Sequence, residues 1–240
     1  MSYDFTLSVA GEAVAVKALF ASTRDYCREF LTEEAATLTV AVTGEDLPRE
    51  QQFLDEEADR EGLRRRRFSE PFLERNFLQR EIARLLGERS ILLLHGSAVA
   101  LDGRGYLFVA PCGTGKSTHG RMWREALGAR CVNDDKPFVR VGDAALLCGS
   151  PWKGKHGLGE NMAVPLQAIC CLERGSQTAL KPLPAREESL LPYTANGEKD
   201  RQAVKKLLQT VPLWRLTCTP TPDAARLCYE TLKKSEISKA

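Results

Sequence analysis

The sequence predicts an α/β fold with α+β character, in which a small α+β lobe precedes a core of strands and helices. Three observations predict it. Short apolar segments of strand length follow one another after residue 90, a glycine-rich loop joins one of them to a helix, and the chain before residue 88 has strand and helix patterns of its own. This change of pattern divides the chain into an accessory lobe, residues 1–88, and a core, residues 89–240.

The accessory lobe opens with a predicted hairpin. Residues 3–16 alternate apolar and polar around Gly11. A short helix follows over residues 22–31, with Ser22 or Thr23 as its cap. The lobe then continues with a strand over residues 36–42, a helix over residues 48–63 and a helix over residues 70–89 that stops at Gly87. The apolar residues of this last helix share one face: Phe72, Leu73, Phe77, Ile82, Leu85 and Leu86.

The core consists of short strands interrupted by one helix that begins near Ser117. The predicted strands cover residues 91–101, 105–111, 129–135, 144–150, 163–175 and 212–218. Helical segments are predicted near residues 186–192, 198–210 and 222–234, the last with Pro222 and Asp223 at its start and lysines at its end.

Composition argues against several function classes. The 240 residues carry a net charge of +2, so no overall basic surface favours nucleic acid or an anionic membrane. We interpret the run Arg64–Arg67 as a solvated helix end or loop; a nucleic-acid role would instead predict steeply salt-dependent binding. The sequence starts without a signal-peptide pattern, and its apolar stretches are too short to cross a bilayer. We therefore expect a cytoplasmic protein.

The eight cysteines do not have metal-site spacing, and we expect reduced thiols. Most stand in apolar strand-like segments and are interpreted as buried filler. Cys112 lies inside the glycine-rich loop, where we interpret it as a passive occupant rather than a redox switch.

The segment "APCGTGKST", residues 110–118, has the pattern of a phosphate-binding loop. It follows an apolar strand and precedes a helix, which is the context that such a loop requires. Its glycines would let backbone N–H groups surround phosphate oxygens, Lys116 would reach the β- and γ-phosphates, and the Ser117 hydroxyl would bind Mg²⁺. Ala110 stands where the usual pattern begins with glycine. The predicted nucleotide-binding residues are Gly113, Thr114, Gly115, Lys116, Ser117 and Thr118, and the predicted cofactors are ATP or another nucleoside triphosphate and Mg²⁺.

Two adjacent carboxylates follow the next strand. Asp134 and Asp135 could bind the metal and accept the proton of an attacking hydroxyl, with Asp134 the predicted metal ligand beside Ser117. The same residues also have the composition of a simple turn. His95, at the end of another strand, could lie near the phosphates or have a structural role.

The glycine-rich segment over residues 149–161 carries Lys153, Lys155 and His156. A cationic loop of this kind could close over the transferred phosphoryl group, and the alternative is a solvated surface loop.

The stretch over residues 92–118, with "VNDDKPFVRV" after it, resembles the C-terminal catalytic domain of HPr kinase/phosphorylase, whose fold is shared with phosphoenolpyruvate carboxykinase. The segment "HGLGEN", residues 156–161, resembles a further signature of those kinases, and together the similarity covers roughly residues 90–175. The resemblance implies that Lys116 and Ser117 hold phosphates and Mg²⁺, and that one of the two aspartates is the general base. It also implies that His95 lies near the transferred phosphate and that Asn161 contacts the substrate.

The departures from that family point to a divergent relative with a different substrate. His156 stands where those kinases carry arginine, which argues against a reverse phosphorylase reaction, and the first 88 residues do not resemble their N-terminal domain. Members of that family are commonly oligomers, so the resemblance allows a homo-oligomer by analogy, although the sequence does not determine the oligomeric state.

The sequence therefore predicts a Mg²⁺- and nucleotide-dependent kinase that transfers the γ-phosphoryl group to a hydroxyl, on a serine of a small protein or peptide or on a small-molecule alcohol. Two other functions stay open: a nucleotide-binding regulatory module without transfer, and an NTPase that drives a partner without a phosphoryl acceptor.

Overall fold

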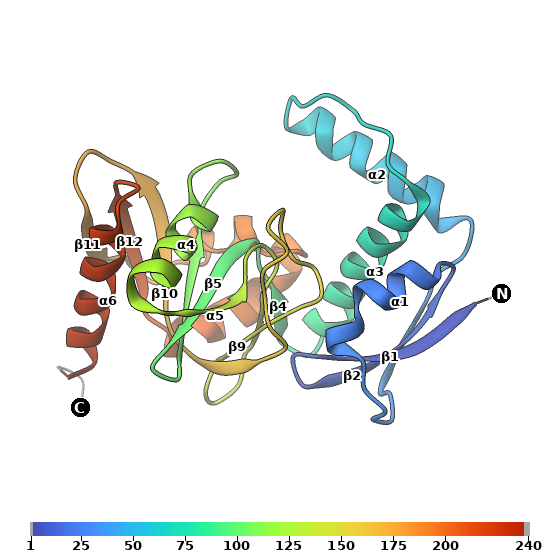
Figure 1. Cartoon of the computed structure of the whole chain (residues 1–240), viewed down its shortest axis with the longest axis horizontal. Coiled ribbons are helices and arrows are strands. Elements are labelled where there is room, and N and C mark those ends of the chain that lie inside the picture. The colour runs from blue at the N-terminus through green and yellow to red at the C-terminus, as the bar shows by residue number, and fades with distance from the viewer. Residues whose placement is uncertain (1, 238–240) are drawn as a thin grey trace. The chain divides into compact units, whose positions relative to one another are not determined.

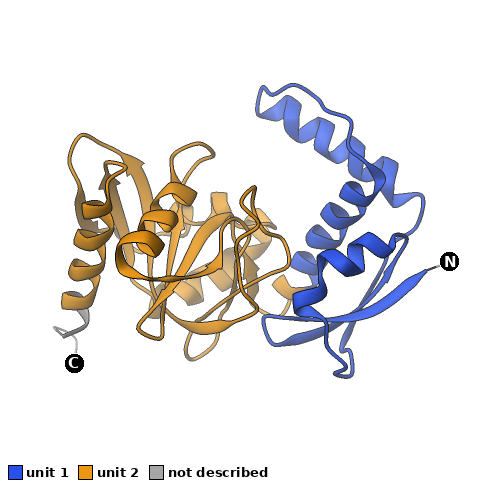
Figure 2. Cartoon of the chain, viewed as in Figure 1, with its two compact units in different colours: residues 1–85 blue, residues 86–240 orange. Residues whose placement is uncertain are grey.

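Across residues 2–237, which the computed structural model describes, the strands form two separate sheets (Figure 1). The three-stranded sheet belongs to a compact unit over residues 1–85, and the nine-stranded sheet to a second unit over residues 86–240 (Figure 2). None of the described helices is long and apolar enough to span a membrane.

The first unit is an α+β lobe. Its elements are β1 (Tyr3–Val9), β2 (Glu12–Ala18), α1 (Ala21–Tyr26), the 3-10 turn η1 (Arg28–Phe30), β3 (Leu38–Ala41), α2 (Asp46–Arg60) and α3 (Glu70–Gly87). The hairpin predicted around Gly11 is confirmed, because β1 pairs antiparallel with β2 through a two-residue turn. Ala10 and Gly11 have φ angles of 51° and 78°, the positive values that such a hairpin turn requires. The third strand, β3, runs parallel to β2.

Two predicted details of the first unit are wrong. Helix α1 begins at Ala21, so Ser22 and Thr23 lie inside it rather than capping it. The Thr23 hydroxyl instead donates to the buried carboxylate of Glu74 on α3, because that carboxylate needs partners away from water. On α3, Phe72 is 38% exposed and stacks on Phe68, whereas Leu78 is buried although it was not assigned to the apolar face.

The second unit contains the remaining strands and helices. Its strands are β4 (Ile91–Leu93), β5 (Gly96–Leu101), β6 (Arg104–Val109), β7 (Arg130–Asn133), β8 (Phe138–Arg140), β9 (Leu146–Cys148), β10 (Ala163–Arg174), β11 (Ala179–Pro182) and β12 (Leu213–Cys218). Its helices are α4 (Lys116–Leu127), α5 (Arg201–Thr210) and α6 (Pro222–Ile237), with 3-10 turns η2 (Glu187–Ser189), η3 (Leu191–Tyr193) and η4 (Gly197–Asp200).

The large sheet is mixed, and the predicted α/β fold class is confirmed. The strand order is β4-β8-β9-β10-β6-β5-β7, and β12 also pairs with β10 and carries β11 at its other edge. Strand β10 runs parallel to β6 and β12, while the other neighbouring pairs of this sheet are antiparallel. Strands β8 and β11 were not predicted, and the helix expected near residues 186–192 consists of two short 3-10 turns, the second of which contains Pro192.

Two apolar layers cover opposite faces of the large sheet. Along β6, Tyr106 and Phe108 belong to the layer that contains residues of α4 and α6, while Leu107 and Val109 belong to the layer that contains residues of α5. Successive side chains of a strand point to opposite faces, so a strand buried on both faces is apolar throughout. Both layers therefore pack against β6, and one of them also contains residues of α4, which the glycine-rich loop joins to β6.

Candidate functional site

The glycine-rich loop leaves the buried end of β6 and enters α4 directly. Gly113 and Gly115 have φ angles of 75° and 121°, in the region where a side chain is disfavoured. Gly115 is the N-cap residue of α4, without a side-chain cap, and the first turn of the helix carries no acidic residue. The positive end of the helix dipole therefore has no side-chain anion of its own.

Lys116 folds back over the loop from which it starts. Its Nζ donates to the carbonyl oxygens of Ala110 and Pro111, at 2.8 and 3.3 Å, and the residue is buried. Burial lowers the pKa of Lys116 below its ordinary value, although the nearby Cys112 and Asp135 act in the opposite direction. The ammonium group thus lies at the loop, where the sequence predicts a phosphate-binding lysine.

Arg174, the last residue of β10, holds the other half of the loop. Its guanidinium donates from Nε to the Thr114 carbonyl oxygen at 3.2 Å and from Nη2 to the Gly113 carbonyl oxygen. In a trans peptide the C=O and the following N–H point in opposite directions, so the N–H of Gly115 points away from Arg174. No sequence pattern points to this residue, since 60 residues separate Arg174 from Thr114.

Asp134 follows β7 and has one carboxylate oxygen without a partner. Its Oδ1 accepts a 2.6 Å hydrogen bond from the N–H of Gly154, whereas its buried Oδ2 has no hydrogen-bond partner among the described residues. A side-chain carbon on Gly154 would lie 3.1 Å from that Oδ2, so the backbone of the 149–161 loop lies directly against the carboxylate. Buried acceptors are normally satisfied, which makes Oδ2 a candidate ligand for a metal or a substrate hydroxyl.

Asp135 has different surroundings. Its Oδ1 lies 3.3 Å from His95 Nε2, and both side chains are about one-third exposed, at 34% and 36%. Burial alone would raise the pKa of Asp135, but the hydrogen bond from His95 and the charges of Lys136 and Lys116 outweigh it and hold the pKa below its ordinary value. The backbone N–H of His95 donates to the Tyr193 carbonyl oxygen at 2.7 Å, which fixes the end of β4.

Asn133 ties these carboxylates to the 149–161 loop. Its buried Oδ1 accepts from the backbone N–H groups of Asp135 and Lys136, at 2.8 and 2.6 Å. Its Nδ2 donates to the carbonyl oxygens of Ser150 and Trp152, at 3.1 and 3.2 Å. In the sequence, the only indication that Asn133 organises a turn is the turn-like composition of "NDDKP", residues 133–137.

The 149–161 loop has a buried base and an exposed tip. Trp152 is buried and packs edge-on against Phe138, with ring centroids 6.3 Å apart. Lys155 and His156 are exposed at the tip. Gly157, with a φ angle of 63°, donates its N–H to the Gly154 carbonyl oxygen and closes the turn. The loop is therefore anchored by apolar packing at its base and presents Lys155 and the His156 imidazole at its tip.

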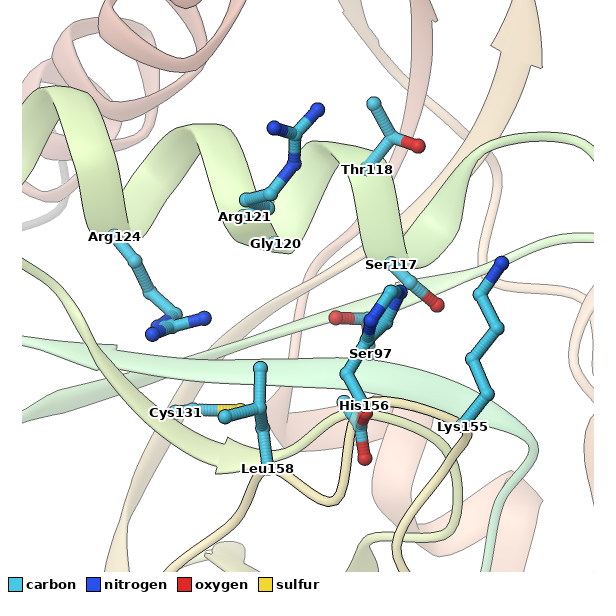
Figure 3. Close-up of a pocket in the computed structure, with 11 residues that line it drawn as sticks. Ser97, Ser117, Thr118, Gly120, Arg121, Arg124, Cys131, Lys155, His156 and Leu158 are labelled. Atoms are coloured by element: carbon cyan, nitrogen blue, oxygen red, sulfur yellow. The ribbon is translucent and has the colours of Figure 1, made fainter.

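A cavity of about 360 Å³ lies between α4 and this loop (Figure 3). It brings together five predicted site residues, namely Ser117, Thr118, Asp134, Lys155 and His156. Its other lining residues were not predicted: Ser97, Gly120, Arg121, Arg124, Cys131 and Leu158. The other eight predicted residues do not line it: Gly113, Thr114, Gly115, Lys116, His95, Asp135, Lys153 and Asn161. Lys116, His95 and Asp135 lie beside the glycine-rich loop instead, while Lys153 is half-buried and Asn161 exposed.

The donor set at this cavity fits Mg²⁺. No group of three or more histidine, cysteine or acidic side chains gathers as a ready-made metal site within the described residues. Mg²⁺ commonly needs only one or two protein oxygens, since phosphates and water complete its shell. Two such oxygens line this cavity: the Ser117 hydroxyl on α4, and Oδ2 of Asp134 after β7, which has no hydrogen-bond partner among the described residues.

Comparison with known proteins finds similarity at the level of structure and not of sequence. The sequence matches no protein-family model, and no curated protein matches it. The structure is similar to that of the Hpr(Ser) kinase/phosphatase from Coxiella burnetii, with 12% sequence identity and a TM-score of 0.38, over 61% of this chain and 97% of that chain. Similarity at this level shows only a distant relationship of fold.

Proposed function

We propose that this protein is a nucleotide- and Mg²⁺-dependent phosphotransferase that moves the γ-phosphoryl group of a nucleoside triphosphate to a hydroxyl. The observation that carries the proposal is the buried Oδ2 of Asp134, which has no hydrogen-bond partner among the described residues. It lies at a cavity shared with Ser117, the second residue of the helix that follows the glycine-rich loop.

The loop would bind the phosphates. Its carbonyl oxygens are occupied by Lys116 on one side and by Arg174 on the other, which leaves inward N–H groups and the start of α4 for phosphate oxygens. Lys116 Nζ now donates to the carbonyl oxygens of Ala110 and Pro111. When a nucleotide binds, the same ammonium group would donate to β- and γ-phosphate oxygens instead.

Ser117 and Asp134 would hold Mg²⁺, which when bound neutralises charge on the phosphates. Asp135 would accept the proton of the acceptor. Its pKa is held below the ordinary value, so it is ionised at neutral pH, and His95 orients its carboxylate through the 3.3 Å contact.

In the transfer step, the oxygen of the acceptor hydroxyl forms a bond to the γ-phosphorus, and the bond from that phosphorus to the β,γ-bridging oxygen breaks. The products are the phosphorylated alcohol and the nucleoside diphosphate, and the hydroxyl proton passes to Asp135. The chain contributes positioning and charge, as phosphoryl transfer requires.

The test compares the wild-type protein with Asp134→Asn and Asp135→Asn, using γ-labelled ATP, Mg²⁺ and a cell extract separated into protein and small-molecule fractions. We expect Asp135→Asn to lower transfer by roughly 10²- to 10⁴-fold while ADP still binds. Asp134→Asn should weaken the Mg²⁺ dependence of nucleotide binding. If both variants transfer label at the wild-type rate, the proposal fails. Steady release of labelled phosphate without a labelled acceptor would favour an NTPase, and nucleotide binding without either product would favour a regulatory module.

A further inference from the structure

We propose that the cavity beside α4 selects an acceptor that is a small anionic alcohol, with a carboxylate or phosphate group a few carbon atoms from the reacting hydroxyl. This inference rests on the proposed function, because it assigns the substrate class of the same site. It starts from one face of α4. Ser117, Gly120, Arg121 and Arg124 all line the cavity, and their spacing of three, four and seven residues places them on one side of the helix.

Gly120 brings this face of α4 close to the sheet. A side-chain carbon at Gly120 would overlap the Ser97 hydroxyl on β5. Glycine is a poor helix former, and its presence in the middle of α4 is explained by this close approach. The cavity floor is therefore built by Ser97 and the Gly120 backbone, and the two arginines lie beside it on the same helix face.

The walls carry a surplus of positive charge. The cationic side chains of Arg124 and Lys155 line the cavity together with Arg121, and Asp134 is its one acidic residue. Throughout the part of the chain that the structure describes, no acidic side chain forms an ion pair with Arg124 or Lys155. Arg121 differs, since its guanidinium lies 3.5 Å from the Glu125 carboxylate. Arg124 is half-buried, and a partly desolvated cation without an acidic partner favours binding of an anion.

The position of Arg124 separates it from the phosphate-binding end of the helix. It follows Ser117 by seven residues, which is about 10 Å along an α-helix. Figure 3 shows Arg124 reaching from α4 toward Cys131 and Leu158, while Lys155 and His156 rise from the opposite loop toward Ser117. Arg124 would thus meet the far end of the acceptor, whereas Ser117 and Asp134 lie where the phosphoryl group would be transferred.

The volume and the other walls define the size of the acceptor. A cavity of about 360 Å³ accommodates a small molecule. Leu158 and Cys131 offer apolar contact to its carbon chain. Burial, and to a lesser extent Asp134, raises the pKa of the Cys131 thiol to about 11, so the thiol is neutral at physiological pH and does not repel an anion.

The experiment measures binding and not turnover. Two matched pairs of probes are titrated calorimetrically into protein saturated with a non-hydrolysable ATP analogue and Mg²⁺, which fills all three phosphate positions of the loop. N-acetylserine is paired with the neutral N-acetylserinamide, and glycerol 3-phosphate with glycerol. We expect at least one anionic member to bind about tenfold or more tightly than its neutral partner, as a charge-assisted hydrogen bond predicts. The pair that shows the preference distinguishes a carboxylate from a phosphate acceptor.

The variants Arg124→Gln and Lys155→Gln should each reduce that preference, whereas Arg226→Gln, an exposed arginine of α6 outside the cavity, should keep it. Equal binding within both pairs would overturn the proposal. An anion preference that persists in both Arg124→Gln and Lys155→Gln would also overturn it. Tighter binding of N-acetylserinamide than of N-acetylserine would do the same, because the amide represents an internal serine of a peptide. Because no phosphoryl transfer is measured, the anion preference can persist even if the kinase function fails.

Discussion

At the scale of single residues, the site depends on polar groups whose partners are set by burial. Asn133 is fully buried and uses both ends of its amide, one toward Asp135 and the other toward Ser150 and Trp152. His119 on α4 is also buried: its Nε2 accepts a 2.9 Å hydrogen bond from Trp123 Nε1, and Nδ1 lies 4.0 Å from Cys218 Sγ. Such groups hold the start of α4 and the acidic turn in one arrangement.

His119 predicts a pH dependence of stability. Burial lowers the pKa of His119 from 6.5 to about 4, so between these values the unfolded state binds more protons than the folded state. The free energy of unfolding should therefore fall as the pH falls from 7.5 to 5, by about 2 kcal/mol from this group. Urea unfolding of the wild-type protein and His119→Gln at both pH values checks this, because carboxylate titration is common to both proteins. An identical pH dependence in the two proteins would rule out this assignment.

At the scale of elements, the strand, loop and helix of the site are held by contacts to neighbouring elements. The glycine-rich loop is fastened by Lys116 within itself and by Arg174 from β10. Helix α4 approaches β5 closely at Gly120. These two contacts make separate predictions, one for ligand binding and one for stability.

Replacing Arg174 should weaken nucleotide binding without unfolding the protein. In Arg174→Met the Gly113 and Thr114 carbonyl oxygens lose their donors, and the loop no longer holds the N–H of Gly115 in place. We expect the Kd for ADP with Mg²⁺ to rise about tenfold. The control is Arg215→Met on the neighbouring strand β12, where Arg215 is exposed and pairs with Glu173 at 3.4 Å. Equal affinities of the two variants, by titration calorimetry, would show that Arg174 does not position the loop.

Gly120→Ala should destabilise the second unit despite the better helix propensity of alanine. The added carbon overlaps the Ser97 hydroxyl, and overpacking of this kind costs about 1–3 kcal/mol. Removing the hydroxyl in the double variant Ser97→Ala/Gly120→Ala should recover most of that loss, because the Ser97 Cβ is 3.5 Å from the added carbon. Chemical denaturation of both single variants and the double variant completes the cycle. Additive effects of the two changes would contradict the close approach.

At the scale of the whole molecule, the candidate site belongs to one unit. The cavity residues and the glycine-rich loop all lie in the unit over residues 86–240, which has its own two apolar layers. The first unit has a separate sheet and buried residues of its own.

This division predicts that the second unit binds nucleotide by itself. A fragment over residues 70–240, which keeps α3 whole, should unfold cooperatively and bind ADP with an affinity close to that of the full chain, because each residue assigned to phosphate binding is retained. Circular dichroism checks folding, and calorimetry checks binding. A folded fragment that does not bind ADP would show that the first unit contributes to the nucleotide site.

The sequence by itself determined the features that depend on neighbouring residues: the hairpin at Gly11, the strand before the glycine-rich loop and the helix after it. The positive φ angle of Gly11, the alternation of buried and more exposed residues along β1 and the glycine at the N-cap of α4 are local properties. A short stretch of chain is therefore enough to specify them. Only the tertiary structure decided which of those residues meet. Asp134 and Asp135 are adjacent in the chain, yet one lines the cavity and the other contacts His95. Arg174 reaches the loop from another strand, and Arg124 gains its significance only when Lys155 comes to face the same cavity. Contacts between distant segments depend on how the sheet and its helix layers pack together, and a short sequence pattern does not contain that information.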